Sequence, residues 1–201
     1  MKLYYMPAAC SLATHIALRE AALPFELERV GRDKKTQSGE DYLAVNPKGS
    51  VPALKLDNGE VLTEAAVIQQ YIADKVPTKK LVPAAGTPER YRVQEWLNYI
   101  SSEVHKGIGQ LFNPAMPEDY KAAVKKSLGE RQLPFLEKAL AGKDYLFGQF
   151  SVADGYLFTV LRWTNIHKID LSGYPNISAF MKRMAARPAV QEALKAEGLE
   201  K

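Results

Sequence analysis

A proline-rich segment divides this chain into two parts with different residue patterns. Residues 76–88 contain three prolines and one glycine, a composition that interrupts helices and strands. Before this segment, strand-like and helix-like patterns alternate, and after it apolar residues recur at helical spacing. The pattern predicts an α/β domain over residues 1–77, a linker without regular structure over 78–87 and an all-helical domain over 88–201.

The first part shows the order strand, helix, strand, short helix, strand, strand, helix. Asn58-Gly59 lies between two apolar runs, a placement typical of a β-hairpin turn. Thr63 precedes the last helix of this part and is expected to be its N-cap. The expected strands are 2–6, 25–30, 51–56 and 60–62, and the expected helices are 11–22, 41–45 and 63–75.

The second part has the pattern of successive amphipathic helices. Thr87 followed by Pro88 indicates a helix start, with proline at the first helical position. Ser151 and Asp154 match a capping box, with aspartate in place of glutamate. Gly155 follows the box and weakens the expected apolar contact of Phe150 with this helix. The expected helices are 90–107, 117–140, one from 151, 176–186 and 188–196.

The composition excludes several classes of protein. Of 201 residues, 46% are hydrophobic and 25% are charged, as in globular chains that bury a core. No apolar run approaches the ~18–20 residues that span a bilayer, and the N-terminus lacks the pattern of a secretory signal. The net charge is +4, with basic and acidic residues interleaved, so neither a membrane nor a nucleic-acid partner is predicted.

Cys10 is the only cysteine, which excludes an internal disulfide and a multi-thiolate zinc site. No metal-ligand spacing is present, so no metal is predicted. His15 and His167 have no polar neighbours in this pattern, and both are expected to be structural. A lone thiol suits a reducing compartment and, together with the missing signal pattern, predicts a cytoplasmic location.

The position of Cys10, between the first strand and the first helix, suits a reactive thiol. A helix N-terminus favours a thiolate, so we expect a thiol pKa below the ~8.5 of free cysteine. Ser11 is expected to donate a hydrogen bond to the sulfur. The alternative for Cys10 is the role of a small buried apolar residue, and the alternative for Ser11 is that of an ordinary helix cap. No second cysteine is available, so redox chemistry here requires an external thiol.

Two further segments suit a ligand with a peptide backbone. A cis bond at Val51-Pro52 would turn the Val51 amide and carbonyl outward; the alternative is a trans proline at a strand start. Thr63-Glu64-Ala65 combines helix-start N–H groups with an acid, which suits an amino-acid head group; the alternative is simple capping.

The helix 90–107 carries a polar face opposite its apolar stripe. At ~100° per residue, Asn98, Ser102 and His105 share this face, and Glu103 and Lys106 flank it. The face is either solvated or directed across a cleft at the first domain. In the second case His105 would be the donor or base nearest a ligand.

Several short motifs occur in one order and spacing along the whole chain. Together they resemble bacterial glutathione S-transferases of the beta class, although each alone has little specificity. The motifs are Lys2-Leu3-Tyr4-Tyr5 with Pro7 and Cys10-Ser11-Leu12, Asn46-Pro47-Lys48-Gly49 with Val51-Pro52 and Leu54, Leu62-Thr63-Glu64, Glu95-Trp96-Leu97-Asn98, Glu103 with His105-Lys106-Gly107, Ser151-Val152-Ala153-Asp154, and Arg187-Pro188 with Val190.

The resemblance implies a thioredoxin-like N-terminal domain, an all-α C-terminal domain and a homodimer, with glutathione as co-substrate. It also implies a cis Val51-Pro52 bond, whose valine backbone would pair with the cysteinyl part of glutathione. Glu64 and the Ala65 amide would hold the γ-glutamyl head. The loop before Tyr42 is one residue short of the family pattern, so either Lys34 or Lys35 would meet the glycyl carboxylate.

By the same resemblance, Cys10 would lie beside the glutathione sulfur, with Tyr5, Ser11 and His105 near it. The residues expected to line the site, some from the partner subunit, are Asn98, Ser102, Glu103 and Lys106. The electrophile pocket is expected around 111–116 and 163–167. Ala8 and Ala65 replace glycines of the family pattern, and each adds a methyl group near the ligand.

The implied function is conjugation of the glutathione thiol to hydrophobic electrophiles, with a role in detoxification. Cys10 adds the option of a mixed disulfide with glutathione, which would support thiol transfer, peroxide reduction or reductive dehalogenation. The alternative is a non-catalytic adaptor of the same fold. That Cys10, Val51-Pro52, Glu64 and His105 occur together favours the enzyme.

Overall fold

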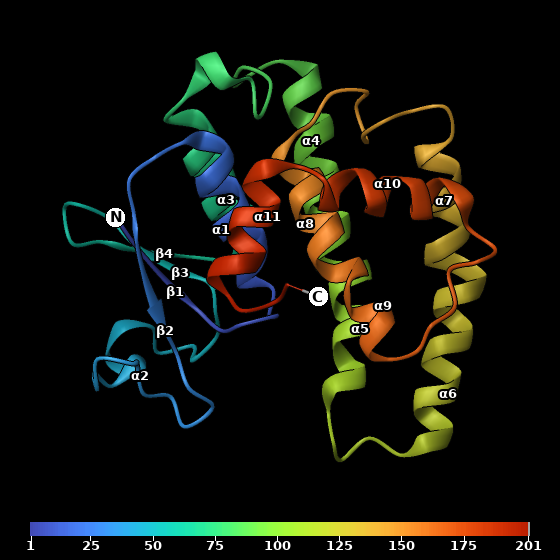
Figure 1. Ribbon diagram of the computed structural model, residues 1–201, viewed down its shortest axis with the longest axis horizontal. Coiled ribbons are helices and arrows are strands. Elements are labelled where there is room, and N and C mark those ends of the chain that lie inside the picture. Colours follow the sequence, from blue (N-terminus) through green and yellow to red (C-terminus); the bar gives the residue numbers. More distant parts are fainter. Residues whose placement is uncertain (201) are drawn as a thin grey trace.

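The computed structural model describes residues 1–200 and shows a sheet domain beside a larger helical domain (Figure 1). The sheet has the order β2-β1-β3-β4, with β1 and β2 parallel and the other pairs antiparallel. This is the predicted thioredoxin-like arrangement. Its strands are β1 (Lys2–Tyr5), β2 (Glu26–Arg29), β3 (Ala53–Lys55) and β4 (Val61–Thr63), and its helices are α1 (Ser11–Ala21), α2 (Tyr42–Val45) and α3 (Ala65–Asp74).

The two faces of the sheet bury different residues, as the alternation along β1 predicts. Leu3 lies in the main core with residues of α1 and α3. Tyr4 lies in a smaller cluster with Tyr42 of α2 and Ala53 of β3. This smaller cluster supports the loop between α2 and β3.

The start of α3 differs from the prediction. Thr63 is the last residue of β4, and Glu64 is the N-cap, with φ 70° and ψ 113°. The Glu64 side chain does not cap the helix, because its Oε1 accepts a hydrogen bond from Lys48 Nζ at 2.8 Å. The first N–H groups of α3 therefore have no side-chain cap, and a ligand can use them.

The helical domain contains two long helices that are interrupted by π-helical turns. The prediction treats each as one continuous α-helix. The first comprises α4 (Pro88–Tyr99), the π-helical η2 (Ile100–His105) and α5 (Lys106–Gly109), and the second comprises α6 (Glu118–Ser127), the π-helical η4 (Leu128–Gln132) and α7 (Leu133–Leu140).

The remaining helices complete this domain. The Ser151–Asp154 capping box is confirmed at the start of α8. Two short 3₁₀ turns were not predicted: η1 (Pro77–Lys79), which lies at the start of the expected linker, and η3 (Gln110–Phe112). The other helices are α8 (Val152–Leu161), α9 (Trp163–Ile166), α10 (Pro175–Ala185) and α11 (Pro188–Ala196). The exact domain limits at 77 and 88 remain a prediction.

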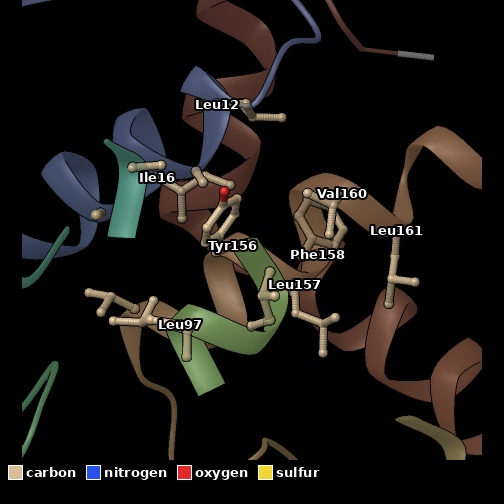
Figure 2. Close-up of a cluster of buried hydrophobic side chains, with 14 of the residues drawn as sticks. Leu12, Ile16, Leu97, Tyr156, Leu157, Phe158, Val160 and Leu161 are labelled. Atoms are coloured by element: carbon tan, nitrogen blue, oxygen red, sulfur yellow. The ribbon is translucent and has the colours of Figure 1, made fainter. Parts of the chain in front are cut away.

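The two domains share one continuous core, in which α8 packs against α1. Figure 2 shows Tyr156 of α8 between Ile16 of α1 and Leu97 of α4. A Cβ atom at Gly155 would lie 3.4 Å from Cγ2 of Ile16, so the glycine permits the close approach of these helices. Two ion pairs also join the domains: Arg187 binds Glu20 with distances of 2.6 and 2.9 Å, and Arg90 binds Asp74 with two distances of 2.7 Å.

Candidate active site

Cys10 is the N-cap of α1, at the predicted junction of strand and helix. Its Sγ donates a hydrogen bond to the carbonyl oxygen of Val51 at 3.1 Å. The Val51-Pro52 peptide bond is cis, which confirms that prediction. The structure thus brings the thiol and the cis-proline loop together from positions 41 residues apart.

The expected low pKa of Cys10 is wrong for this structure. Burial raises the pKa of the thiol to about 11, although the backbone N–H groups of Cys10 and Ser11 and the charge of Lys106 lower it. Desolvation disfavours the thiolate, and the Val51 carbonyl accepts a hydrogen bond only from the protonated form. Cys10 is therefore a neutral thiol near pH 7.

The Ser11 hydroxyl, next to Cys10 in sequence, does not bond the Cys10 sulfur. Ser11 Oγ donates to the carbonyl of Met6 at 3.2 Å and accepts from the Met6 N–H at 3.2 Å. The hydroxyl therefore closes the turn between β1 and α1, which corrects the expected bond to sulfur. Tyr5 is buried at the end of β1, and burial raises the pKa of its hydroxyl.

Two side chains hold the loop that carries Val51. Tyr42 Oη donates to the Ser50 carbonyl at 2.6 Å, and Asn46 Nδ2 donates to the same oxygen at 2.8 Å. Within residues 1–200, no protein acceptor receives the Val51 N–H. A backbone donor beside a thiol fits the peptide-like ligand that the sequence predicts.

The structure distinguishes between Lys34 and Lys35. Lys34 is half-buried, and its Nζ donates to the Gly49 carbonyl at 2.7 Å, two residues before Val51. Lys35 is exposed. Lys34 is thus the lysine that lies against the cis-proline loop.

His105 is half-buried against Tyr156 and Trp163 rather than on a fully solvated face. Its Nδ1 is 2.7 Å from the Tyr156 hydroxyl, and its ring packs edge-on to Trp163 at 5.0 Å. Because η2 is π-helical, the 100° spacing used to place His105 opposite the apolar stripe does not apply. Burial, with the charge of Lys106, lowers the pKa of His105 to about 4, so the ring is neutral near pH 7.

Tyr156 is not among the predicted site residues, yet its hydroxyl contacts His105. Burial raises the pKa of this hydroxyl, and a negative charge on Cys10 would raise it further. Tyr156 therefore keeps its proton, and its hydroxyl either donates to Nδ1 or accepts from it, according to the tautomer of the imidazole. A tyrosine in a helix that is buried throughout requires a hydrogen-bond partner, and this was the available sequence signal.

The other predicted lining residues are more exposed. Asn98, Ser102 and Glu103 are exposed on α4 and η2. Lys106 is also exposed, and its charge lowers the pKa values of both Cys10 and His105. The charge of Glu64 acts on the same two groups in the opposite direction, so Glu64 and Lys106 both face the Cys10–His105 region.

The two segments expected to form an electrophile pocket meet through their aromatic side chains. Phe112 lies edge-on to Trp163 with ring centroids 5.3 Å apart, and edge-on to His167 at 4.4 Å. Trp163 also contacts His105. These rings form an apolar surface next to the neutral imidazole.

His15 does have polar neighbours, which corrects the prediction. Its Nδ1 lies 3.0 Å from Oε1 of Glu197, and its Nε2 accepts a hydrogen bond from Arg19 at 3.4 Å. His15 and Glu197 are both buried. The pairing spans 182 residues, so no local pattern could reveal it.

A cavity of about 940 Å³ lies elsewhere, between the interdomain segment and residues 143–151. It is lined largely by apolar side chains, including Val82, Val93 and Phe147, and it includes none of the residues around Cys10. We place the candidate site at Cys10 because a thiol, a backbone donor and a neutral imidazole converge there.

A thioredoxin-like sheet, a cis-proline loop and an all-helical second domain define the two-domain glutathione transferase class. Two family models match the chain: glutathione S-transferase, N-terminal domain, over residues 8–75, and glutathione S-transferase, C-terminal domain, over residues 81–188. The chain therefore belongs to the glutathione S-transferase family of enzymes. Bacterial beta-class members are among the solved structures that it resembles, as the motifs implied.

Individual relatives match along their full length. Glutathione S-transferase GstA of Escherichia coli O157:H7 is 52% identical over 202 residues, with 100% of both chains covered. The structure described as a ternary complex of BphK, a bacterial GST, has a TM-score of 0.96 at 56% identity, covering 99% of this chain and 100% of that chain. A sphingomonad glutathione S-transferase complexed with glutathione has a TM-score of 0.95 at 48% identity, with 100% of both chains covered.

Proposed function

We propose that this enzyme binds glutathione along the Val51 loop and transfers its sulfur to hydrophobic electrophiles. The observation that carries the proposal is the Cys10 thiol, 3.1 Å from the Val51 carbonyl at a cis-proline, with the Val51 N–H available to a ligand. The sphingomonad relative solved with glutathione supports the choice of ligand.

The residues around the loop match the parts of glutathione. The Val51 backbone would pair with the cysteinyl unit as a short antiparallel strand does. Glu64 and the Ala65 N–H at the start of α3 would hold the ammonium and carboxylate of the γ-glutamyl head. Lys34 would meet the glycyl carboxylate, because it is the lysine that already contacts this loop.

In conjugation, the glutathione sulfur forms a bond to an electrophilic carbon, the leaving group departs with its electron pair, and the thiol proton passes to solvent. The charge of Lys106 would favour the reacting thiolate, and so would the Nε2–H of His105 in the tautomer whose Nδ1 accepts from Tyr156. Because the pKa of His105 is lowered to about 4, the neutral ring is too weak a base to take the thiol proton near pH 7, and the role proposed for its remaining N–H is hydrogen-bond donation. The surface of Phe112, Trp163 and His167 would receive the electrophile.

His105→Ala is expected to lower kcat for conjugation by roughly 10²-fold, the usual effect of losing one preorganised donor. Because the pKa of His105 is lowered, the ring becomes charged only near and below about pH 4. The wild-type rate should therefore show no inflection from this group between pH 5.5 and 8. Steady-state kinetics across this range check both statements, and activity within twofold of wild type would show that His105 only fills space.

The same thiol supports a second candidate activity, the transfer of glutathione between disulfides. The Cys10 sulfur would attack a glutathione mixed disulfide, form a bond to the glutathione sulfur and release the other thiolate. A glutathione thiolate would then attack the new bond, which gives oxidised glutathione and returns Cys10. Peroxide reduction and reductive dehalogenation would use the same protein–glutathione disulfide.

The test of the function is a panel of electrophiles and mixed disulfides assayed with glutathione. Consumption of the glutathione thiol in the presence of an electrophile supports the conjugation proposal. The most active compounds indicate which electrophiles the pocket accepts. Retention on glutathione resin with no turnover on any compound would instead indicate a non-catalytic adaptor. A cytoplasmic location and a role in detoxification belong to the same proposal. Within residues 1–200, no helix is long and apolar enough to cross a membrane.

The proposed assembly is a homodimer, and an aromatic cluster on the outer side of the helical domain suits its interface. Trp96 and Tyr99 of α4 pack against Phe135 of α7, with ring centroids 5.6 and 5.0 Å apart. Phe135 remains 49% exposed. A two-fold axis would bury such a surface against its own copy, and partner residues would then lie near Asn98, Ser102 and Glu103.

Sedimentation should give a mass of about 45 kDa, which is twice the chain mass of 22.4 kDa. Phe135→Glu should shift the population toward monomer, because it places a charge in the apolar interface. Tyr120→Glu is the matched control, since Tyr120 is 54% exposed on α6 outside the cluster. A monomer mass at all concentrations of the wild-type protein would contradict the dimer.

A further inference from the structure

The C-terminal end of the chain carries a buried carboxylate that the proposed mechanism does not use. Helix α11 lies beside α1, the helix that begins at Cys10 (Figure 1). After α11 the chain turns back: the Leu199 N–H donates to Leu194 O at 2.8 Å, and Gly198 has φ 68°. This turn directs Glu197 inward, and its side chain has no exposed surface. Glutamate is rarely buried without partners.

The two carboxylate oxygens of Glu197 have different partners. Oε1 lies 3.0 Å from Nδ1 of His15, and Oε2 accepts the N–H of Ala8 at 3.3 Å. Because Arg19 donates to the other ring nitrogen of His15, the proton of a neutral ring lies on Nδ1 and points at Glu197. The charge of Glu197 also reaches Tyr5, whose pKa it helps to raise, and Arg162, where it opposes the lowering of the pKa by burial.

The carbonyl of Ala8 is held as well as its N–H. Its carbonyl accepts the Nε1–H of Trp163 at 2.9 Å. Ala8 has φ 62°, in the left-handed region that is unfavourable for a residue with a Cβ atom. Both contacts come from the helical domain, and Ala8 is two residues before Cys10. The helical domain therefore helps to hold this turn, which the Ser11 hydroxyl also closes from within its own domain.

We propose that Glu197 and Trp163 are positioning residues that clamp Ala8 and thereby set the place of the Cys10 thiol against Val51. The proposal rests on the proposed function of this site. It makes the C-terminal turn part of the active site. Trp163 also connects the proposed electrophile surface to the turn that precedes Cys10. Its ring contacts Phe112 and His105, and its N–H donates to the Ala8 carbonyl.

The direct test is the rate at which iodoacetamide alkylates Cys10, which is the only thiol in the protein. This rate needs no transferase turnover, so it tests the clamp even if the proposed function fails. Trp163→Phe keeps an aromatic ring and removes the donor, while Glu197→Leu removes both acceptors. Either change should free the turn and expose the Cys10 thiol to water, which lowers its pKa. The rate of alkylation at pH 8 should then rise about tenfold for each unit by which this pKa falls.

Conjugation should change in the opposite direction. A displaced thiol and Val51 loop should lower kcat/KM for glutathione by about tenfold or more. Glu197→Gln retains one acceptor oxygen for Ala8 and should recover most of the wild-type alkylation rate. Glu192→Gln is the control, because Glu192 is an exposed carboxylate of α11 whose side chain pairs with Arg19 at 3.5 Å and does not reach Ala8. This variant should match the wild type in both assays.

All rates are compared under conditions in which circular dichroism shows each variant to be folded. If Glu197→Leu does not fold, Trp163→Phe alone decides the question. Faster alkylation combined with slower conjugation supports the clamp. Wild-type alkylation in the folded Trp163→Phe and Glu197→Leu variants would overturn it, and these contacts would then serve stability alone.

Discussion

Cys10→Ala is expected to abolish the transfer of glutathione between disulfides and to leave most of the conjugating activity in place. Disulfide transfer passes through the protein sulfur, so no residual route exists without it. In conjugation the nucleophile would be the sulfur of glutathione, which the proposed binding mode holds through Val51, Glu64 and Lys34. The measurement is paired kinetics of one variant with a glutathione mixed disulfide and with an aromatic electrophile.

The raised pKa of Cys10 adds a dependence on pH. With a pKa of about 11, the thiolate fraction rises about tenfold per pH unit between pH 7 and 10. The rate at which oxidised glutathione adds one glutathione to Cys10 should rise at the same pace, and mass spectrometry follows the adduct. Cys10→Ser is the control, because it keeps a donor for the Val51 carbonyl but no nucleophilic sulfur.

Two results would contradict this division of roles. Equal losses in both reactions would show that Cys10 positions glutathione in general. No loss in either reaction, together with no adduct, would show that the thiol only packs between the loop and α1.

Local motifs predicted the parts of the site that depend on local geometry. Cys10 lies at a helix start because a short strand and an amphipathic helix adjoin it in sequence. The Val51-Pro52 turn is held by Asn46, which belongs to the same motif. Such features depend on a few neighbouring residues, which a sequence displays directly.

The errors arose where burial or distant contacts decide the chemistry. The helix dipole at Cys10 was visible in the sequence, but the burial that outweighs it was not. The ideal 100° spacing does not apply at His105, because this residue lies in a π-helical turn, which leaves no clear mark in the residue pattern. The Glu197 contacts to His15 and Ala8 join residues 182 and 189 positions apart. Such pairings follow from the assembled fold alone.

Asp154→Ala should cause a large loss of stability in the helical domain. The Asp154 carboxylate is fully buried at the start of α8 and accepts three hydrogen bonds: Leu146 N–H at 2.8 Å, Ser151 N–H at 2.8 Å and Ser151 Oγ at 2.9 Å. Alanine leaves these donors buried without a partner, and each such donor costs about 1–3 kcal/mol. We expect the free energy of unfolding in urea to fall by about 3–5 kcal/mol.

Asp170→Ala is a matched control for this change. Asp170 also accepts an N–H and a hydroxyl from one serine, Ser172, with two distances of 2.8 Å, but it is exposed. Water replaces these bonds when Asp170 is lost, so its variant should stay within about 0.5 kcal/mol of wild type. Because α8 packs against α1, which begins at Cys10, Asp154→Ala should also weaken the contact between the domains. Similar unfolding free energies for the two variants would show that the capping box contributes little to this fold.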